Sequence, residues 1–173
     1  MAKPNWKNRT IFIGDNLNVL KNMSSKSVDL IYLDPPFKSN KKYEGKNRTG
    51  FKDTWSLRDI DATWLRKIAL ANPALHDLIK IAASTHSDSM KAYLVFMGIR
   101  LLELHRILKE TGSIYLHCDP TASHYLKIMM DAVFGTDNFK NDIVWRVWLR
   151  KIALANPALH DLIKIEPVHI QTS

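Results

Sequence analysis

The stretch VDLIYLDPPF, at residues 28–37, decides the fold of this chain. Its first six residues are mostly apolar and predict a strand over 28–33. The strand has to stop at its carboxyl end, because Pro35 holds the preceding Asp34 in an extended conformation and Pro36 has no backbone N–H to donate. We therefore predict a strand that ends in a rigid turn carrying an acid and an aromatic residue.

Strand and helix patterns alternate along the rest of the chain. Further strands are predicted at 10–14, 113–117 and 143–148, and helices at 16–23, 64–81, 90–109 and from about 120 to 135. Within 64–81, Asn72 and Pro73 fit an N-cap followed by proline at the first helical position, so this segment should form two short helices. The alternation indicates an α/β fold with a mostly parallel sheet and helices on both faces.

The two most regular helices define the expected core. The helix at 90–109, which should end at Thr111 and Gly112, has on one face Tyr93, Met97, Leu101, Leu104 and Leu108. The next helix, which we expect Asp119 and Pro120 to cap and Gly135 to stop, has the apolar face Ala122, Leu126, Met129 and Val133.

The chain is basic: its 173 residues include 25 Lys and Arg against 17 Asp and Glu, a formal net charge of +8. Many of the cations lie in a loop predicted at 38–62, namely Lys38, Lys41, Lys42, Lys46, Arg48 and Lys52. Such a loop either binds a polyanion or is simply solvated, and charge alone does not decide between them. The single cysteine, Cys118, excludes an internal disulfide, and no apolar run has the length of a membrane span, so we expect a cytoplasmic protein.

An internal duplication divides the chain. The sequence WLRKIALANPALHDLIKI occurs at 64–81 and again at 148–165, identical at all eighteen positions. Structural repeats normally diverge and have atypical terminal copies, so we interpret the second copy as a recent duplication. The alternative is a pair of helices selected or designed to match. On the first interpretation, residues 1–147 form one part of the protein and 148–173 another.

The turn at 34–37 has a specific chemical use. In open α/β sheets ligands bind beyond the carboxyl ends of the strands, which is where Asp34 is expected. Its carboxylate and the backbone carbonyl of Pro35 provide two acceptors, which match the two hydrogens of an amino group. Holding both hydrogens draws an aromatic amine toward tetrahedral geometry and makes its nitrogen a nucleophile. Phe37 offers a flat face for a base taken out of a duplex, a contact worth about 1–3 kcal/mol.

The tetrapeptide DPPF resembles motif IV of the amino-group DNA methyltransferases. The flanking segments IFIGDNLNVLKNM and ELHRILKETGSIYLHCDPTASHYLKIMMDAVFGTDNFKNDIVW look like those of site-specific adenine methyltransferases from restriction–modification systems and phages. The similarity runs over about residues 10–146 and includes only the first copy of the duplicated segment. It implies a partial Rossmann-like fold of the S-adenosylmethionine-dependent methyltransferases over 1–147, with 148–173 as a misplaced copy and tail.

The resemblance also implies an activity and a role for particular residues. The expected reaction transfers a methyl group from S-adenosylmethionine to the N6 amine of adenine at a specific site in double-stranded DNA. Asp34 and the carbonyl of Pro35 would hold the amine, Pro36 would shape the turn, and Phe37 would stack on the flipped base. Asp rather than Ser at the first position favours adenine N6 over cytosine N4. Asp15 is the candidate for contacting the cofactor, and the basic loop would lie near the DNA backbone.

One feature of the family is missing. Enzymes with this motif order carry a glycine-rich cofactor loop of the form F-x-G-x-G downstream of the region seen here. The six glycines of this chain stand at 14, 45, 50, 98, 112 and 135, too far apart to form it. We therefore predict the amino-terminal part of a methyltransferase, an incomplete copy, with a restriction subunit or a separate carboxyl-terminal half as an expected protein partner.

Several alternatives remain open at this point. The chain could be a noncatalytic nucleic-acid-binding remnant, or DPPF could be only a turn that ends a strand. Methylation of protein glutamine is disfavoured, because the related family carries Asn where this chain has Asp34. His117, Cys118, Asp119 and His124 could suggest a metal site. We expect no metal there, because strand alternation sends the first two to opposite faces and the residues fit roles in the core and as a helix cap.

Overall fold

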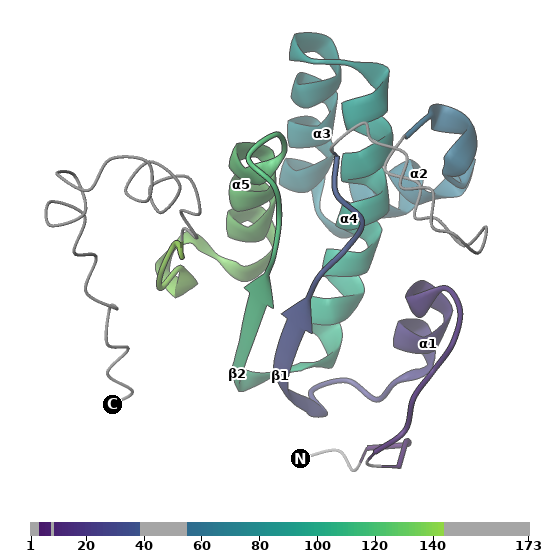
Figure 1. Cartoon of the computed structure of the whole chain (residues 1–173), viewed down its shortest axis with the longest axis vertical. Coiled ribbons are helices and arrows are strands. Elements are labelled where there is room, and N and C mark those ends of the chain that lie inside the picture. Colours follow the sequence, from purple (N-terminus) through teal and green to yellow (C-terminus); the bar gives the residue numbers. More distant parts are fainter. Residues whose placement is uncertain (1–3, 8, 39–54, 144–173) are drawn as a thin grey trace, which may run out of the picture. The chain divides into compact units, whose positions relative to one another are not determined.

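The computed structural model describes residues 4–7, 9–38 and 55–143 (Figure 1). The helices are α1 (Asn16–Asn22), α2 (Ala62–Ala71), α3 (Pro73–Thr85), α4 (Asp88–Ile107) and α5 (Ser123–Phe134), with short 3-10 turns at Leu57–Asp59 and Thr136–Asn138. The strands are β1 (Val28–Leu33) and β2 (Leu108–Leu116). The chain divides into compact units at 1–139 and 140–173, and all these elements belong to the first. The boundary predicted at 147 lies outside the described residues.

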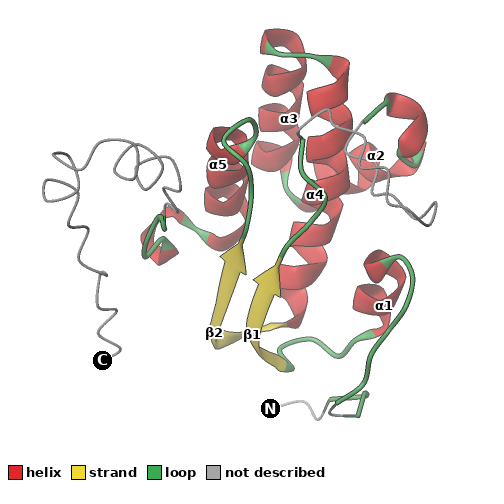
Figure 2. Ribbon diagram, in the orientation of Figure 1, coloured by secondary structure: helices red, strands yellow, loops and turns green. Residues whose placement is uncertain are grey.

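The two strands form a parallel sheet, which confirms the predicted α/β class. Leu30 pairs with Ser113, and the register continues to Leu33 with Leu116. Parallel neighbours need a long crossover, and here the helices α2, α3 and α4 provide it (Figure 2).

The end of α4 was predicted too late along the chain. The helix stops at Ile107, not at Thr111 and Gly112, and β2 begins at the next residue. Leu108 already has extended backbone angles and pairs with Val28 of β1. Because this pairing satisfies backbone groups of a neighbouring strand, it outweighs the local helical pattern that continues through Leu108.

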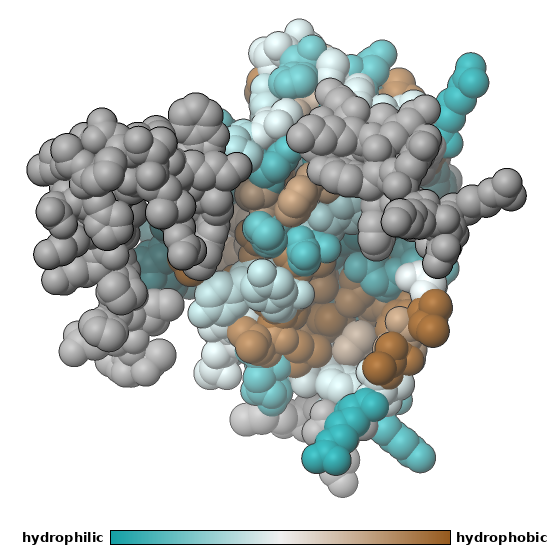
Figure 3. All heavy atoms as spheres, viewed as in Figure 1, coloured by the Kyte–Doolittle hydropathy of each residue, from teal (hydrophilic) through white to brown (hydrophobic). Residues whose placement is uncertain are grey.

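The sheet has one covered and one exposed face. Ile31 is buried, and Leu33, Ile114 and Leu116 are partly buried against the same core. Residues on the opposite face remain exposed: Leu30 (60%), Tyr32 (69%) and Tyr115 (45%). Figure 3 shows hydrophobic residues in brown on this face. The predicted second layer of helices is therefore not among the elements that the structure describes.

Helix α4 is the centre of the core. It packs against α1, α2, α3 and α5, and the five side chains predicted to share its apolar face are all buried. Gly98 lies where the neighbours come closest. A Cβ added there would be 3.2 Å from Cδ1 of Ile68 in α2 and 3.4 Å from Cδ1 of Ile79 in α3. The absence of a side chain at Gly98 thus allows three helices to pack tightly.

The predicted break within 64–81 is confirmed at Asn72. This residue ends α2 and caps α3, accepting a hydrogen bond from the N–H of Leu75 at 3.0 Å, and Pro73 takes the first turn. The Asn72 amide also donates to the carbonyl of Ala132 in α5 at 2.8 Å. One side chain therefore sets both the turn between two helices and their distance from a third.

The apolar face of α5 and its end at Gly135 are also confirmed, but its start is not. The N-cap residue is Ala122, which makes no side-chain hydrogen bond, and Asp119 lies outside the helix. Asp119 Oδ1 is buried and has no hydrogen-bond partner among the described residues. The chain first has to turn away from the sheet between the end of β2 at Leu116 and the start of α5 at Ser123. Asp119 lies within this connection, so its carboxylate does not cap the backbone N–H groups of the first turn of α5.

The strand predicted at 10–14 is absent. Ile11 and Ile13 are 88% and 99% exposed, and the segment has no regular structure. A strand is stable only when another strand completes its backbone hydrogen bonds, and residues 10–14 pair with neither strand of the sheet that the described residues form. The strand predicted at 143–148 lies outside the described residues except for Ile143, which is in no regular element.

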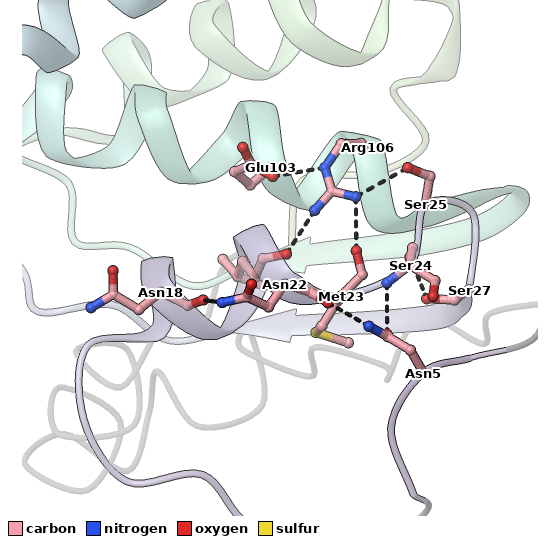
Figure 4. Close-up of polar contacts among 10 residues, drawn as sticks. Asn5, Asn18, Asn22, Met23, Ser24, Ser25, Ser27, Glu103 and Arg106 are labelled. Carbon is pink, nitrogen blue, oxygen red and sulfur yellow. Dashed lines mark hydrogen bonds and ion pairs between the residues drawn. The ribbon is translucent and has the colours of Figure 1, made fainter.

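Arg106, at the end of α4, ties that helix to α1 (Figure 4). Its guanidinium donates to the carbonyls of Leu20 at 2.7 Å and Met23 at 2.8 Å, and it pairs with Glu103 at 2.8 Å. Carbonyls at the end of a helix need donors, and Arg106 donates to two of them, although Leu20 also accepts from the N–H of Met23. These bonds fix the end of α1 and the chain that leads into β1.

Candidate active site at the carboxyl ends of the strands

The carboxyl ends of β1 and β2 bring Asp34 and His117 together. The backbone N–H of His117 donates to the carbonyl of Leu33 at 2.8 Å, which extends the ladder one residue past β2. His117 Nδ1 then lies 3.2 Å from Asp34 Oδ1. The side chain of Asp34 is 59% exposed and that of His117 is 54% exposed, so both are accessible from solvent.

Asp34 also lines a pocket of about 330 Å³. The pocket is bounded by Gly14, Asp15, Asn16, Leu33, Asp34, Pro35, Pro36, Phe96, Met97 and Arg100. It therefore joins the turn after β1, the start of α1 and one side of α4. Asp15 and the first three residues of DPPF, singled out separately in the sequence, share this pocket. Phe37 is not among the lining residues.

Asp15 is strongly engaged with the protein itself. Its Oδ1 accepts from the N–H of Leu17 at 2.8 Å, which caps α1, and from Nη2 of Arg100 at 2.8 Å. The side chain of Arg100 is only 4% exposed, against 47% for Asp15. The ion pair compensates for burying a guanidinium, so Asp15 helps to build the wall of the pocket.

Arg100 has further partners within the wall. It donates to Asn16 Oδ1 at 2.9 Å and to the carbonyl of Phe96 at 3.0 Å, and its guanidinium carbon lies 3.4 Å from the centre of the Phe96 ring. Burial lowers the pKa of Arg100, while the charge of Asp15 and the hydrogen bond to it act in the opposite direction. An arginine stays protonated in spite of such a shift, so this side of the pocket contains a fixed positive charge.

Phe37 is held from two sides. Its ring meets that of His117 nearly at right angles, at 78° with 5.2 Å between centres. Its carbonyl accepts from Nε1 of Trp55 at 3.3 Å, and Trp55 packs against Tyr93 and Phe96 of α4. The aromatic residue of DPPF is therefore anchored to the core through Trp55.

Lys38 departs from its expected place in a solvated basic loop. It is 2% exposed, and burial lowers its pKa, while the charge of Asp119 acts to raise it. It follows directly on Phe37 and is buried, whereas the resemblance implied a place on the DNA-facing surface. The other cations of the predicted loop, from Lys41 to Lys52, lie outside the described residues.

Two residues of the site were missed from the sequence, Arg100 and His117. Arg100 is separated from its partner Asp15 by 85 positions, and no local pattern joins them. His117 had been assigned to the core or to a metal-site alternative, yet its side chain is half exposed. Its position could have been found, because two neighbouring parallel strands that both end after an apolar run must bring their next residues together. In the part of the chain that the structure describes, no three His, Cys, Asp or Glu side chains form a group able to hold a metal ion.

Comparisons with known proteins agree with the sequence of the site. Residues 28–152 match the N6/N4 DNA methylase family. The chain is 31% identical over 163 residues to the Mod subunit of the type III restriction–modification enzyme StyLTI of Salmonella typhimurium, and 30% identical over 140 residues to the type II methyltransferase M.KpnI of Klebsiella pneumoniae. It is 26% identical over 137 residues to the DNA adenine methyltransferase YhdJ of Escherichia coli.

These matches cover most of this chain and a minor part of each relative. They include 88%, 78% and 79% of the chain, but 22%, 26% and 33% of the three relatives in the same order. None of the helices described here has both the length and the apolar character needed to cross a membrane. The family match spans more than half of the residues of this chain and includes the DPPF turn, so the chain belongs to the N6/N4 DNA methylase family.

Proposed function

We propose that this chain contains the amine-binding part of a DNA methyltransferase that acts on the N6 atom of adenine and uses S-adenosylmethionine. The observation that carries the proposal is the exposed carboxylate of Asp34, which lies at the end of a parallel strand and lines a pocket. The match to the N6/N4 DNA methylase family supports the reaction class, and Asp at the first position of the motif supports adenine. The cytoplasm is the proposed place of action.

Each residue of the DPPF turn has a separate proposed role in binding the adenine. The carboxylate of Asp34 and the carbonyl of Pro35 accept the two hydrogens of the N6 amine, and Pro36 keeps the turn rigid. Phe37 stacks on the adenine ring after the base leaves the duplex. With its hydrogens held, the N6 lone pair forms the new bond to the methyl carbon. The methylated amine then loses one proton, which passes by way of the exposed carboxylate of Asp34 to water.

The pocket beside Asp34 has features that suit the cofactor. S-adenosylmethionine, when bound, supplies the methyl group, and the carbon–sulfur bond that breaks leaves its electrons on sulfur. Phe96 and Met97 offer apolar surface for a flat ring system, and Asn16 and Asp15, whose Oδ1 atoms already accept from Arg100, offer the polar part of the lining. Asp15 already pairs with Arg100, so its part in cofactor binding is proposed as a single hydrogen-bond acceptor.

Two partners are proposed. The first is double-stranded DNA, whose phosphates suit the net charge of +8. The second is a polypeptide with the remaining strands and the F-x-G-x-G loop of the methyltransferase domain. Leu30, Tyr32 and Tyr115 leave an exposed apolar face on the sheet, and apolar surface of this kind is normally covered. We favour such a carboxyl-terminal half over a restriction subunit, because a sheet face is best completed by elements of the same domain.

The experiment incubates the full chain with adenine-containing duplex DNA and S-adenosylmethionine labelled in the methyl group. The product, N6-methyladenine, is then measured by mass spectrometry of the digested DNA. We expect product with the unchanged chain and about 10²–10³-fold less with Asp34→Ala. Equal product from both proteins would contradict the role given to Asp34.

A second candidate function is a noncatalytic DNA-binding remnant. The observation that favours it is the net charge of +8, which suits binding to DNA phosphates whether or not a methyl group is transferred. The same incubation distinguishes the candidates if DNA binding is measured in parallel by fluorescence anisotropy. Retained DNA binding without any N6-methyladenine would favour the remnant.

A further inference from the structure

His117 contacts both side chains to which the proposed function assigns the capture of the base. Its Nδ1 lies 3.2 Å from Oδ1 of Asp34, and its ring lies 5.2 Å from the ring of Phe37. Neither contact is local in the sequence, since His117 comes from the strand neighbouring the one that ends in Asp34. The histidine therefore joins the amine acceptor to the stacking ring.

The backbone of His117 is fixed although its side chain is half exposed. The hydrogen bond from its N–H to the carbonyl of Leu33, at 2.8 Å, continues the register of the sheet. The ring itself is restrained by its contact with the ring of Phe37, so it can present one edge to Asp34 without being buried. By contrast, the carboxylate of Asp34 is 59% exposed and receives no hydrogen bond from the other described residues. A short exposed side chain of this kind occupies several rotamers unless a neighbour favours one.

We propose that His117 is a positioning residue, which selects one orientation of the Asp34 carboxylate and one orientation of the Phe37 ring before the base arrives. The proposal rests on the proposed function, because only a bound adenine gives these orientations a use. Contact with Nδ1 engages Oδ1 of Asp34, so Oδ2 is the oxygen that accepts from the N6 amine. The nearly perpendicular ring of His117 packs against Phe37, and the base stacks on a face of Phe37 that His117 does not cover.

Three variants separate the two contacts. His117→Phe keeps a ring beside Phe37 but has no nitrogen for Asp34, and His117→Asn keeps a polar atom near the place of Nδ1 but has no ring. His117→Ala removes both. His124→Phe is the matched control, because His124 is an exposed histidine in α5 with no described contact to Asp34 or Phe37. Thermal unfolding of all four variants checks that each one folds.

The first measurement needs no activity. NMR coupling constants between Hα and Hβ of Asp34 report its rotamers in the full chain. We expect one dominant rotamer in the unchanged chain, in His117→Asn and in His124→Phe, and averaged values in His117→Phe and His117→Ala. The same averaging in the unchanged chain, or one dominant rotamer in every variant, would overturn the positioning role.

The second measurement is methyl transfer to duplex DNA. Misplaced catalytic groups cost up to about a hundredfold in rate, so we expect kcat to fall about tenfold to a hundredfold in His117→Phe with little change in the Kd for DNA. His117→Asn should recover most of this rate. Weaker DNA binding with an unchanged kcat would contradict the positioning role. If the unchanged chain forms no product while the rotamer results hold, the proposed transfer fails and the positioning of Asp34 stands.

Discussion

Asp15 and Asp34 face the same pocket from two regions that are built in different ways. Asp15 stands at the start of α1, where one oxygen caps the helix and pairs with the buried Arg100. Asp34 stands beyond β1, where the described residues give it one neighbour, a half-exposed histidine. Two hydrogen bonds from the protein end on Oδ1 of the first carboxylate, whereas the second has a single side-chain contact among the described residues. Lining a pocket is therefore a weaker sign of catalysis than having unused acceptors there.

The largest expected effect separates the two acids by activity. Asp34→Ala should lower methyl transfer by about 10²–10³-fold, as is typical when a preorganised group that binds the reacting atoms is lost. Its free energy of unfolding should change by less than about 0.5 kcal/mol, because the side chain is exposed. Transfer rates and urea unfolding measure the two quantities. A large loss of stability would place Asp34 in the same class as Asp15.

Asp15 should show the opposite pattern. Asp15→Ala removes a helix cap and leaves Arg100 buried without its ion-pair partner, so we expect a loss of about 2–3 kcal/mol in the free energy of unfolding. The expected loss is smaller than the loss on breaking a fully buried ion pair, because the side chain of Asp15 is 47% exposed. Asp15→Asn keeps the cap and should lose less. Equal unfolding midpoints for the unchanged chain and Asp15→Ala would show that the pair contributes nothing.

A smaller effect is expected at Trp55, behind the Asp34 side of the pocket. Trp55→Phe keeps an aromatic ring against Tyr93 and Phe96 but removes the donor to the carbonyl of Phe37. We expect a loss of about 0.5–1.5 kcal/mol in the free energy of unfolding, the usual net value of one hydrogen bond. Chemical denaturation measures it. Trp64→Phe is the control, since Trp64 has no hydrogen bond to the DPPF turn among those described.

The smallest effect concerns pH and Lys38. Burial lowers its pKa in the folded chain below the model-peptide range, so the unfolded chain binds more protons at pH values just below about 10.4. Stability relative to Lys38→Met should therefore rise as pH rises through this window. Urea unfolding of both proteins between pH 8 and about 10.4 gives the difference. A difference that falls with pH would mean that the attraction of Asp119 outweighs burial.

The parts of the fold that local patterns determine were predictable from the sequence. The buried faces of α4 and α5 follow from apolar residues at helical spacing, and the break at Asn72 follows from capping chemistry. The end of β1 follows from two prolines. In each case the physical cause lies within a few residues of its effect.

The parts that depend on distant partners were not predictable in this way. Residues 10–14 have the composition of a strand, but a strand forms only where another one accepts its hydrogen bonds. The start of β2 at Leu108 depends on pairing with Val28, and the wall of the pocket depends on Arg100 reaching Asp15. The position of His117 was predictable in part. Once two neighbouring parallel strands are predicted, their register places His117 beside Asp34.

The most direct test of the account is whether Asp34 recognises the amine of adenine. The full chain, labelled with ¹⁵N, is titrated with deoxyadenosine and with the purine deoxyriboside that lacks the amino group, and the same is done with Asp34→Ala. We expect deoxyadenosine to shift the amide signals of Asp34 and Phe37 at lower concentration than the purine deoxyriboside, and we expect this preference to disappear in Asp34→Ala. A preference that survives the substitution, or equal binding of both nucleosides by the unchanged chain, would contradict the central claim.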